Sequence, residues 1–420
     1  MKTFKAGALY YAIFIAFFIA LISGLMMLQH WYQRYYILYV TQGERLDRNL
    51  QSASLIVIQN PQSFPVNEVK MLDIFDDSLD IVSVTKKWWG GYQVVETEAN
   101  WRVINKSKKI LVGTEILSRD VITLYLADEG KYLSIAGKTE IKGNCFIPKL
   151  GIRKAYIEGT GYAGSKLIEG TIKNSGENLP EPDQEFVNQN RLAAQQKINP
   201  TDSIIEWGEL IKNSKVENSF YNKTLRVNTN GWITLENLQL SGNIKLISTA
   251  GITVKNTAAL QDVILFAPKI EFEENFQGSL QCFATDTILI GTDCIFKFPT
   301  LIAMNETTIK NPIVEIRKGS VILGDIIVIA KSESNDSSPE CIFQENSLVN
   351  GSVYCAGKVN LKGSIRGQLF CNGFILKTYS SIYENHLMNA KMDGTMLSQY
   401  YAGSMFITSD KLQKTIKCLE

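Results

Sequence analysis

The stretch GSVYCAGKVNLKGSIRGQLFCNG, residues 351–373, repeats glycine at intervals of six residues. Each glycine is followed two residues later by a β-branched residue, which gives the pairs Gly351/Val353, Gly357/Val359 and Gly363/Ile365. Such short units are typical of a parallel β-helix, whose sides are short strands and whose coils stack about 4.8 Å apart. We therefore expect the β-branched side chains to point inward. The glycines should lie at corners, where φ is positive or neighbouring coils approach closely.

The same kind of pattern extends through residues 231–275, where Ile, Leu and Val alternate with polar residues. Gly, Asn or Ser-Gly breaks the alternation every six to ten residues or so. Strands of a β-sandwich usually recur at about 8–12 residues with defined hairpin turns. The closer spacing of Ile233, Leu235, Leu238 and Leu240 leaves too little chain for such hairpins, so the pattern favours a parallel β-helix.

An apolar segment near the N-terminus contains no charged residue from Ala6 to Leu28. At about 1.5 Å per helical residue, this segment spans the ~30 Å hydrocarbon core of a membrane. Lys2 and Lys5 precede it and the first basic residue after it is Arg34, so the positive-inside rule predicts a cytoplasmic N-terminus. A cleaved signal peptide is the alternative. However, the run exceeds the usual apolar region of about 7–15 residues and no A-x-A site follows, which favours a retained anchor.

The helical pattern continues beyond the membrane segment. Leu46, Leu50, Ala53 and Val57 follow helical spacing, and no proline occurs before Pro61. We expect one continuous helix of about 50 residues, lipid-embedded first and amphipathic afterwards.

The beginning of the chain combines a short basic leader, a small residue and a long apolar helix. Lys5-Ala6-Gly7 would end the leader and Ala8-Leu9 would start the mature helix. Over about 55 residues this segment resembles type IV pilins and the pseudopilins of type II secretion systems. Ala12 stands where the family usually has glutamate, a departure also found in minor pseudopilins that cap such filaments. A plain single-pass anchor is the simpler expectation for the same residues.

Between about residues 80 and 126 the hydrophobic period becomes two. IVSVTKKWW and YQVVET read as strands joined by a Gly90-Gly91 hairpin, and WRVI, KKILVG and VITLYL read as further strands. Four aromatic residues should cluster on this meander, as core packing or as a carbohydrate-stacking platform: Trp88, Trp89, Tyr92 and Trp101. The polar, proline-containing segment 174–200 reads as a linker or excursion with a short helix around Gln184–Gln195.

Residues 341–385, which contain NGSVYCAGKVNLKGSIRGQLFC, resemble the bactofilins, the polymer-forming bacterial cytoskeletal proteins. The resemblance implies a right-handed parallel β-helix, a structural role and no nucleotide requirement. The chain departs from that family in its long anchor and its extra β domain. With the expected topology its repeats lie outside the cytoplasm, which puts a cytoskeletal role in doubt.

The composition argues against several kinds of chemistry. The chain has only two histidines, His30 and His386, which argues against a histidine dyad or a histidine-rich metal site. The formal net charge of +1 provides no field that would attract nucleic acid. Seven cysteines without a CxxC motif read as buried core residues. Cys355 and Cys371 lie near one coil period apart, so they could stack.

Acidic residues are the remaining candidates for chemistry, because β-helices also host enzymes that act on polysaccharides. Glu271 and Glu273 would share one strand face and could bind a cation, although a solvated outer face is the simpler explanation. The other acidic candidates are Glu274, Asp262, Asp286 and Asp293. No catalytic, cofactor-binding or metal-binding residue is assigned, and no cofactor or enzymatic activity is expected.

The sequence therefore predicts a mainly β protein with an N-terminal transmembrane α-helix, a small antiparallel β region and a parallel β-helix (β-solenoid). The expected parts are an anchor with its amphipathic extension (1–60), a β-rich domain (61–175), a linker or excursion (176–215), a β-helix (216–400) and a C-terminal cap of the last coil (401–420).

We expect a single-pass inner-membrane protein with a periplasmic bulk, acting as a structural or assembly component of a pilus-like or type II secretion-like envelope system. Its partners would be membrane lipid, envelope proteins and further copies of itself, and not nucleic acid. The alternatives are an anchored β-helical protein that binds or degrades polysaccharide, and a bactofilin-like polymer on the membrane.

Overall fold

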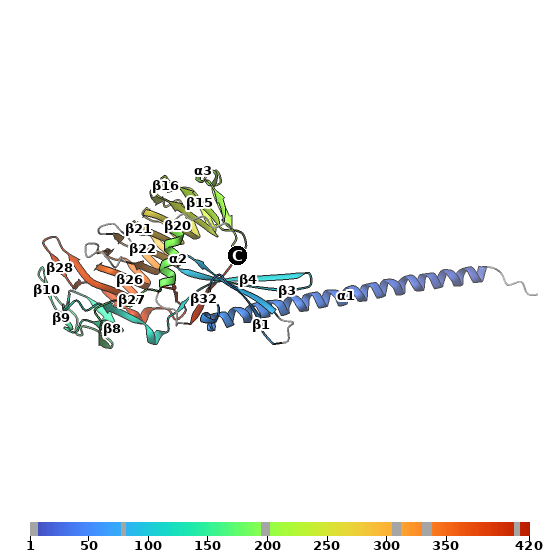
Figure 1. Cartoon of the computed structure of the whole chain (residues 1–420), viewed down its shortest axis with the longest axis horizontal. Coiled ribbons are helices and arrows are strands. Elements are labelled where there is room, and N and C mark those ends of the chain that lie inside the picture. Colours follow the sequence, from blue (N-terminus) through green and yellow to red (C-terminus); the bar gives the residue numbers. More distant parts are fainter. Residues whose placement is uncertain (1–6, 77–80, 195–201, 305–311, 330–337, 407–411) are drawn as a thin grey trace, which may run out of the picture. The chain divides into compact units, whose positions relative to one another are not determined.

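The computed structural model describes residues 7–76, 81–194, 202–304, 312–329, 338–406 and 412–420 (Figure 1). The chain is mainly β with one long apolar helix at its N-terminal end. It divides into two compact units. The first comprises Met1–Ile56, Val69–Thr85 and Glu96–Lys108, and the second comprises Val57–Glu68, Lys86–Val95 and Lys109–Glu420.

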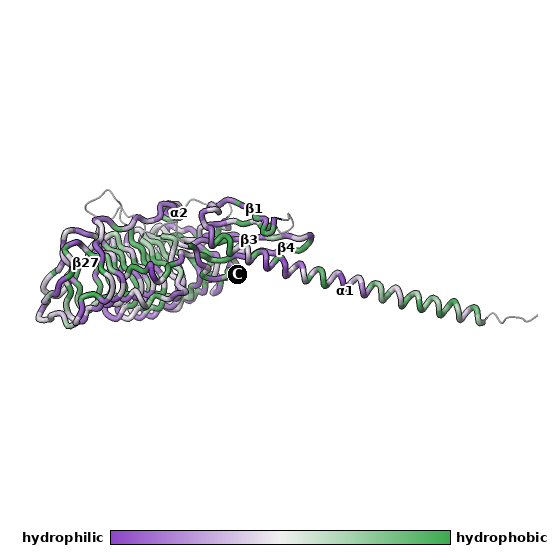
Figure 2. Tube along the Cα trace, turned by 90° about the horizontal axis from the view of Figure 1, so that it is seen from below, coloured by the Kyte–Doolittle hydropathy of each residue, from purple (hydrophilic) through white to green (hydrophobic). Residues whose placement is uncertain are grey.

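The long helix α1 (Gly7–Gln59) is continuous, as predicted from the absence of proline before Pro61. Its first half is apolar (Figure 2) and every side chain from Gly7 to Thr41 is exposed. Burial begins at Gly43 and follows the predicted face through Leu46, Leu50 and Ala53. By its length and composition, α1 could cross a membrane.

An antiparallel sheet follows α1 in the chain, with strand order β1-β2-β3-β4-β31 and β32 pairing with β4. Its strands are β1 (Val69–Asp73), β2 (Ile81–Trp89), β3 (Tyr92–Trp101), β4 (Ile104–Glu115), β31 (Ala402–Gly403) and β32 (Gln413–Leu419). The Gly90-Gly91 hairpin joins β2 to β3 as predicted, and Gly90 has a φ of +62°. The predicted strand WRVI is wrong, because Trp101 ends β3, Arg102 turns with a φ of +52° and Ile104 starts β4.

Within the first unit, the second half of α1 buries Leu46 and Leu50, and the strands bury Val82, Val84 and Ala99. An ion pair of 2.5 Å joins Lys106 Nζ to Asp47 Oδ2 at the unit's surface. The unit is thus a single helix packed on antiparallel strands, with the rest of the helix bare.

The second unit contains a large, mostly parallel sheet that closes on itself. Its strands are β5 (Ile122–Leu126), β7 (Glu140–Lys142), β8 (Asn144–Ile147), β12 (Ile172–Asn174), β13 (Ser203–Ile205), β14 (Lys215–Asn218), β15 (Leu225–Thr229), β16 (Ile233–Leu235), β17 (Gln239–Gly242), β18 (Ile244–Ser248), β19 (Ile252–Val254), β20 (Ala259–Phe272), β21 (Gln277–Ile290), β22 (Ile295–Met304), β23 (Ile313–Ile316), β24 (Val321–Val328), β25 (Glu340–Phe343), β26 (Leu348–Leu361), β27 (Ser364–Lys377), β28 (Ile382–Glu384, antiparallel to β27) and β30 (Lys391–Asp393).

Smaller elements complete this unit. They are the sheet β29 (His386–Met388), β6 (Leu133–Ala136) and β9 (Ile152–Lys154), the pair β10 (Tyr156–Ile157) and β11 (Thr160–Gly161), the helices α2 (Gln184–Ala194) and α3 (Trp207–Leu210), and the 3-10 turns η1 (Pro61–Ser63), η2 (Ser118–Asp120) and η3 (Gly394–Met396). Helix α2 confirms the short helix predicted there, although residues 195–201 of the predicted linker lie outside the described residues.

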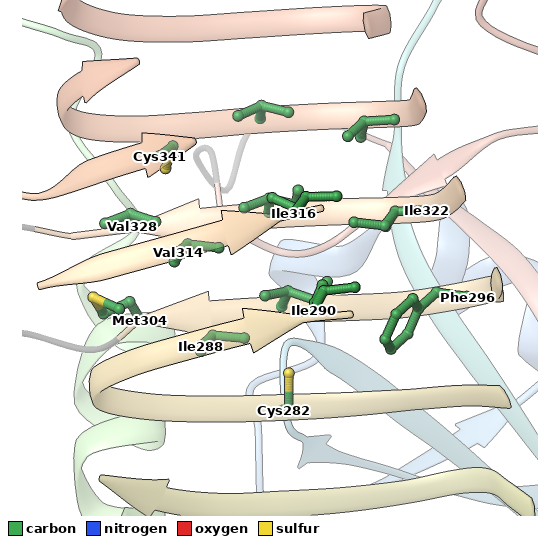
Figure 3. Close-up of a cluster of buried hydrophobic side chains, with 14 of the residues drawn as sticks. Cys282, Ile288, Ile290, Phe296, Met304, Val314, Ile316, Ile322, Val328 and Cys341 are labelled. Carbon is green, nitrogen blue, oxygen red and sulfur yellow. The ribbon is translucent and has the colours of Figure 1, made fainter. Parts of the chain in front are cut away.

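The parallel pairing has a regular register. From β15 to β27, paired residues lie about 15 to 20 positions apart in the chain, as in Ile252↔Ile270 and Ile270↔Ile288. The separation rises to about 24 to 27 where the chain between partners includes residues 305–311 or 330–337. Apolar side chains from successive strands therefore stack in columns in the interior, as Figure 3 shows for β21 to β25.

In the stretch 351–373 the predicted inward positions are confirmed, but Gly351 and Gly357 lie within the single strand β26 and do not separate short strands. Val353, Val359 and Ile365 are at most 1% exposed, and Val353 is in register with buried Ile326 and Leu369. A Cβ at Gly351, where φ is +155°, would lie 2.0 Å from the Gly324 carbonyl oxygen. Only glycine permits this approach of neighbouring strands.

Two segments pair in ways that their local pattern did not indicate. β27 pairs with β5, β5 with β8, and β8 with β12, so residues 122–174 join the same parallel sheet as residues 364–377. The segment 401–420, predicted to cap the last coil, instead supplies β31 and β32 to the antiparallel sheet beside β4. Both arrangements depend on pairing between residues that are hundreds of positions apart.

Candidate functional site

The acidic candidates Glu271, Glu273 and Glu274 do share one surface groove of about 420 Å³, beside Lys255 and Arg317. Glu273 Oε1 lies 3.0 Å from Lys255 Nζ, and this hydrogen bond holds the pKa of Glu273 below its usual value. Within the described residues, no group of three or more His, Cys, Asp or Glu side chains could hold a metal ion. The groove is therefore a mixed-charge surface rather than a cation site.

The other acidic candidates are dispersed. Asp262 accepts a hydrogen bond from the Lys417 ammonium, and Asp286 lies 3.6 Å from Lys269 Nζ. Asp293 occupies a turn with a φ of +55°. Each of these residues has a local structural explanation.

Three of the four predicted aromatic residues share one hydrophobic cluster. Trp89 and Tyr92 are buried in it and Trp88 packs against it, whereas Trp101 belongs to the first unit. Trp89 packs edge-on against Phe220, with ring centroids 5.1 Å apart. Core packing thus explains Trp89 and Tyr92, whereas Trp88 and Trp101 are partly exposed.

The cysteines and histidines form no reactive pair. Cys355 and Cys371 are in register on β26 and β27, as their spacing suggested, and both thiols are free and buried. Burial raises the pKa of Cys371 well above its usual value, which keeps the thiol protonated. His30 lies on α1 in the first unit and His386 lies on β29 in the second.

A buried carboxylate that the sequence pattern does not single out is Asp325, on β24. Its Oδ2 accepts a hydrogen bond from the Ser404 backbone N–H at 2.6 Å, and its Oδ1 accepts from the Ser352 N–H at 3.0 Å and from the Tyr401 hydroxyl. Burial raises the pKa of Asp325 above its usual value. The adjoining cavity of about 30 Å³ has room for a single water molecule. This cluster is too small for a substrate, and it joins the C-terminal strands to the parallel sheet.

A second unpredicted feature is a pocket of about 190 Å³ over the antiparallel strands of the second unit, here called the Lys86 pocket. Its lining includes four polar side chains that are at most 8% exposed: Lys86, Gln93, Thr114 and Gln413. Apolar side chains, one further amide and two carboxylates complete it: Pro61, Phe64, Pro65, Val66, Trp88, Met405, Gln62, Asp183 and Glu185. Burial lowers the pKa of Lys86 to about 8, against the attraction of Glu185.

The alternation of β2 indicates that the Lys86 side chain points inward, because Lys86 lies an even number of residues from the buried Val82 and Val84. A lysine on the inward face of a strand destabilises the fold unless its ammonium has a hydrogen-bonding or charged partner. The burial of Gln413 could not be predicted in the same way, because its position depends on the pairing of β32 with β4.

No protein-family model, curated protein or solved structure matches this chain. The function must therefore be argued from its own residues.

Proposed function

We propose that this protein is a membrane-anchored structural or assembly component of a bacterial envelope system, single-pass, with its bulk in the periplasm. The apolar, exposed first half of α1 carries the proposal. A helix segment that is apolar all round and is not covered by any of the described residues needs lipid or other apolar helices around it.

The division of α1 supports the resemblance to pilins and pseudopilins. Its first half is bare, while its second half buries Leu46, Leu50 and Ala53 in a unit with antiparallel strands. In this proposal the first half lies in the membrane and packs against further copies or against envelope proteins. The β part then serves as an extracytoplasmic scaffold.

We also propose that the parallel sheet is a β-solenoid in the bactofilin style. The repeated register of about 15 to 20 residues and the columns of buried side chains support this architecture. A solenoid supplies shape and surface, which suits a structural role.

The alternative of polysaccharide binding rests on one specific observation. The indole of Trp232 is 47% exposed, and its Nε1 donates to Thr253 Oγ1 at 2.8 Å. Thr253 lines the groove of Glu271 and is in register with it. An exposed indole beside a polar groove can stack on a sugar ring. Glycan binding that is lost in both Trp232→Ala and Glu271→Gln would favour this alternative over the structural role.

Topology is tested by fusing the full chain at Glu420 to a reporter enzyme that is active only outside the cytoplasm. We expect activity from this fusion. If this fusion is inactive, and a second fusion at Glu420 to a reporter that works only in the cytoplasm is active, the proposed topology is contradicted. That result would favour a bactofilin-like polymer on the inner face of the membrane.

Assembly through α1 is tested by disulfide cross-linking in membranes. The background variant is Cys418→Ser, because Cys418 is the one exposed cysteine and the other six are buried. We expect a covalent dimer from Leu28→Cys, which is 67% exposed on α1, and none from the control Tyr156→Cys, which is 75% exposed on β10. If Leu28→Cys gives no cross-linked dimer, or if both variants give equal amounts, assembly through α1 is contradicted and α1 is a membrane anchor alone.

A further inference from the structure

The Lys86 pocket gathers one buried polar side chain from each of four strands. Lys86 lies on β2, Gln93 on β3, Thr114 on β4 and Gln413 on β32, in the order in which those strands pair. Sheets usually bury apolar side chains on a covered face, and buried polar groups are costly unless they are fully hydrogen-bonded. A row of four such groups facing one cavity is typical of a binding site.

Two of these groups have hydrogen-bonding capacity available to a ligand. Gln413 Nε2 donates to Gln93 Oε1 at 2.9 Å, but the Gln413 Oε1 atom is buried without a partner. Lys86 Nζ donates to the Pro61 carbonyl oxygen at 3.0 Å, and an ammonium has three protons to donate. The pocket therefore presents an acceptor that needs a donor, and a buried cation that favours an anion.

The two carboxylates of the pocket come from the start of α2. Asp183 Oδ1 accepts hydrogen bonds from the backbone N–H groups of Glu185 and Phe186, at 2.8 and 3.0 Å. Glu185 Oε1 accepts one from Trp88 Nε1 at 3.1 Å, and its side chain is exposed. The pocket thus has a buried positive charge and a negative charge near the solvent.

This charge arrangement is complementary to a zwitterion. A volume of about 190 Å³ corresponds to about six water molecules at ~30 Å³ each, which suits a small molecule and not a polymer chain. Phe64, Met405 and Trp88 offer an apolar wall for the remainder of the ligand.

We propose that the Lys86 pocket binds an α-amino carboxylate with an apolar side chain. The ligand carboxylate contacts Lys86 Nζ, its ammonium donates to Gln413 Oε1 and faces Glu185, and its side chain packs on Phe64 and Met405. This inference is independent of the proposed assembly role. Free amino acids such as leucine carry this group.

Binding is tested by isothermal titration of the full chain in detergent micelles with three matched probes. Leucine has both charges, N-acetyl-leucine lacks the ammonium and leucinamide lacks the carboxylate. We expect leucine to bind at least tenfold more tightly than either analogue. Absence of leucine binding, or equal affinity for leucine and leucinamide, would overturn the proposal.

Variants then assign the binding to this pocket. We expect Lys86→Met and Gln413→Leu each to weaken leucine binding at least tenfold, whereas the control Lys87→Met, at the exposed neighbouring position, leaves it unchanged. Melting curves establish that each variant is folded. Unchanged affinity in a folded Lys86→Met protein would also overturn the proposal.

The pH dependence of the unmodified protein gives a readout that needs no variant. Lys86 has a pKa of about 8, and the other charged residues among those that line the pocket are the carboxylates Asp183 and Glu185. The affinity should therefore fall as the pH rises above 8 for leucine and also for N-acetyl-leucine, which has no ammonium of its own to titrate. An N-acetyl-leucine affinity that stays constant or rises contradicts a role for the Lys86 ammonium. Comparison with diaminopimelate, whose side chain ends in a second amino and carboxylate group, tests the apolar contact: we expect weaker binding than for leucine, and tighter binding of diaminopimelate would contradict the apolar side chain.

Discussion

The substitution Gly351→Ala tests whether close approach of neighbouring strands defines the parallel sheet. A Cβ at this position would lie 2.0 Å from the Gly324 carbonyl oxygen and 2.8 Å from the Gly324 carbonyl carbon. Both contacts are with backbone atoms, so no side-chain rotation relieves them. Gly324 itself has the same relation to Thr300, and Gly367 has it to Gly351, so the strands cannot separate at one point without disturbing the column.

The cost has two parts. Overpacking of a well-packed interior costs about 1–3 kcal/mol. Placing an L-residue at the Gly351 φ of +155° adds about 1–2 kcal/mol. We therefore expect Gly351→Ala to lower the free energy of unfolding by about 2–5 kcal/mol.

The assay is urea unfolding followed by tryptophan fluorescence, with Gly231→Ala as the control. Gly231 is exposed and a Cβ there would meet no atom nearer than 3.8 Å, so this variant should stay within about 0.5 kcal/mol of the unmodified protein. A Gly351→Ala protein as stable as the control would refute the argument that backbone proximity requires glycine here.

Three further substitutions probe the buried polar and thiol groups. Tyr401→Phe removes a hydroxyl donor from the buried Asp325 carboxylate and should lower the free energy of unfolding in urea by about 1.5–3 kcal/mol. The control Tyr400→Phe, at an exposed position, should lower it by less than about 0.5 kcal/mol. If the loss in Tyr401→Phe does not diminish at acidic pH, where Asp325 becomes protonated, this reason is contradicted. Lys86→Met should raise stability at pH 7, because burial of the charged ammonium, which lowers the pKa of Lys86 from 10.5 to about 8, destabilises the native state. The native ammonium loses its proton before the unfolded one does, so the gain should shrink between pH 8 and 10.5. A gain that does not change with pH would count against this reason. Thiol titration of the native protein should show one fast cysteine, lost in Cys418→Ser, and six that react only after unfolding; several fast thiols would disprove the burial of the others.

Local periodicity was sufficient to predict the elements whose residues are close in sequence. The inward positions of Val353, Val359 and Ile365 follow from a period that the chain repeats within one stretch. Helix α1 and the Gly90-Gly91 hairpin follow from the same kind of local information, because both depend on neighbours a few residues away.

Pairing over long sequence distances could not be predicted in this way. Nothing in residues 122–126 indicates that β5 pairs with β27, about 245 residues later in the chain. Likewise, the mixed composition of residues 401–420 is compatible with a cap as well as with strands beside β4. In each case both partners have generic apolar alternation, which many other strands could match equally well.

The same limit explains why both buried polar clusters were missed. Asp325 obtains its donors from Ser352, Tyr401 and Ser404, and the Lys86 pocket obtains its unpartnered acceptor from Gln413. Each cluster exists only because the last residues of the chain return to β4.

Thr114 on β4 connects these two clusters. It lines both cavities, and its hydroxyl donates to the Ser404 carbonyl oxygen at 3.1 Å while the Ser404 N–H donates to Asp325. A ligand that shifts Thr114 in the Lys86 pocket would therefore change the hydrogen bonds of the Asp325 cluster as well, because the two share one strand and one bonded residue. The C-terminal strands thus complete the Lys86 pocket and connect it to the parallel sheet, and the proposed recognition of a small molecule depends on the polar residues beside β4.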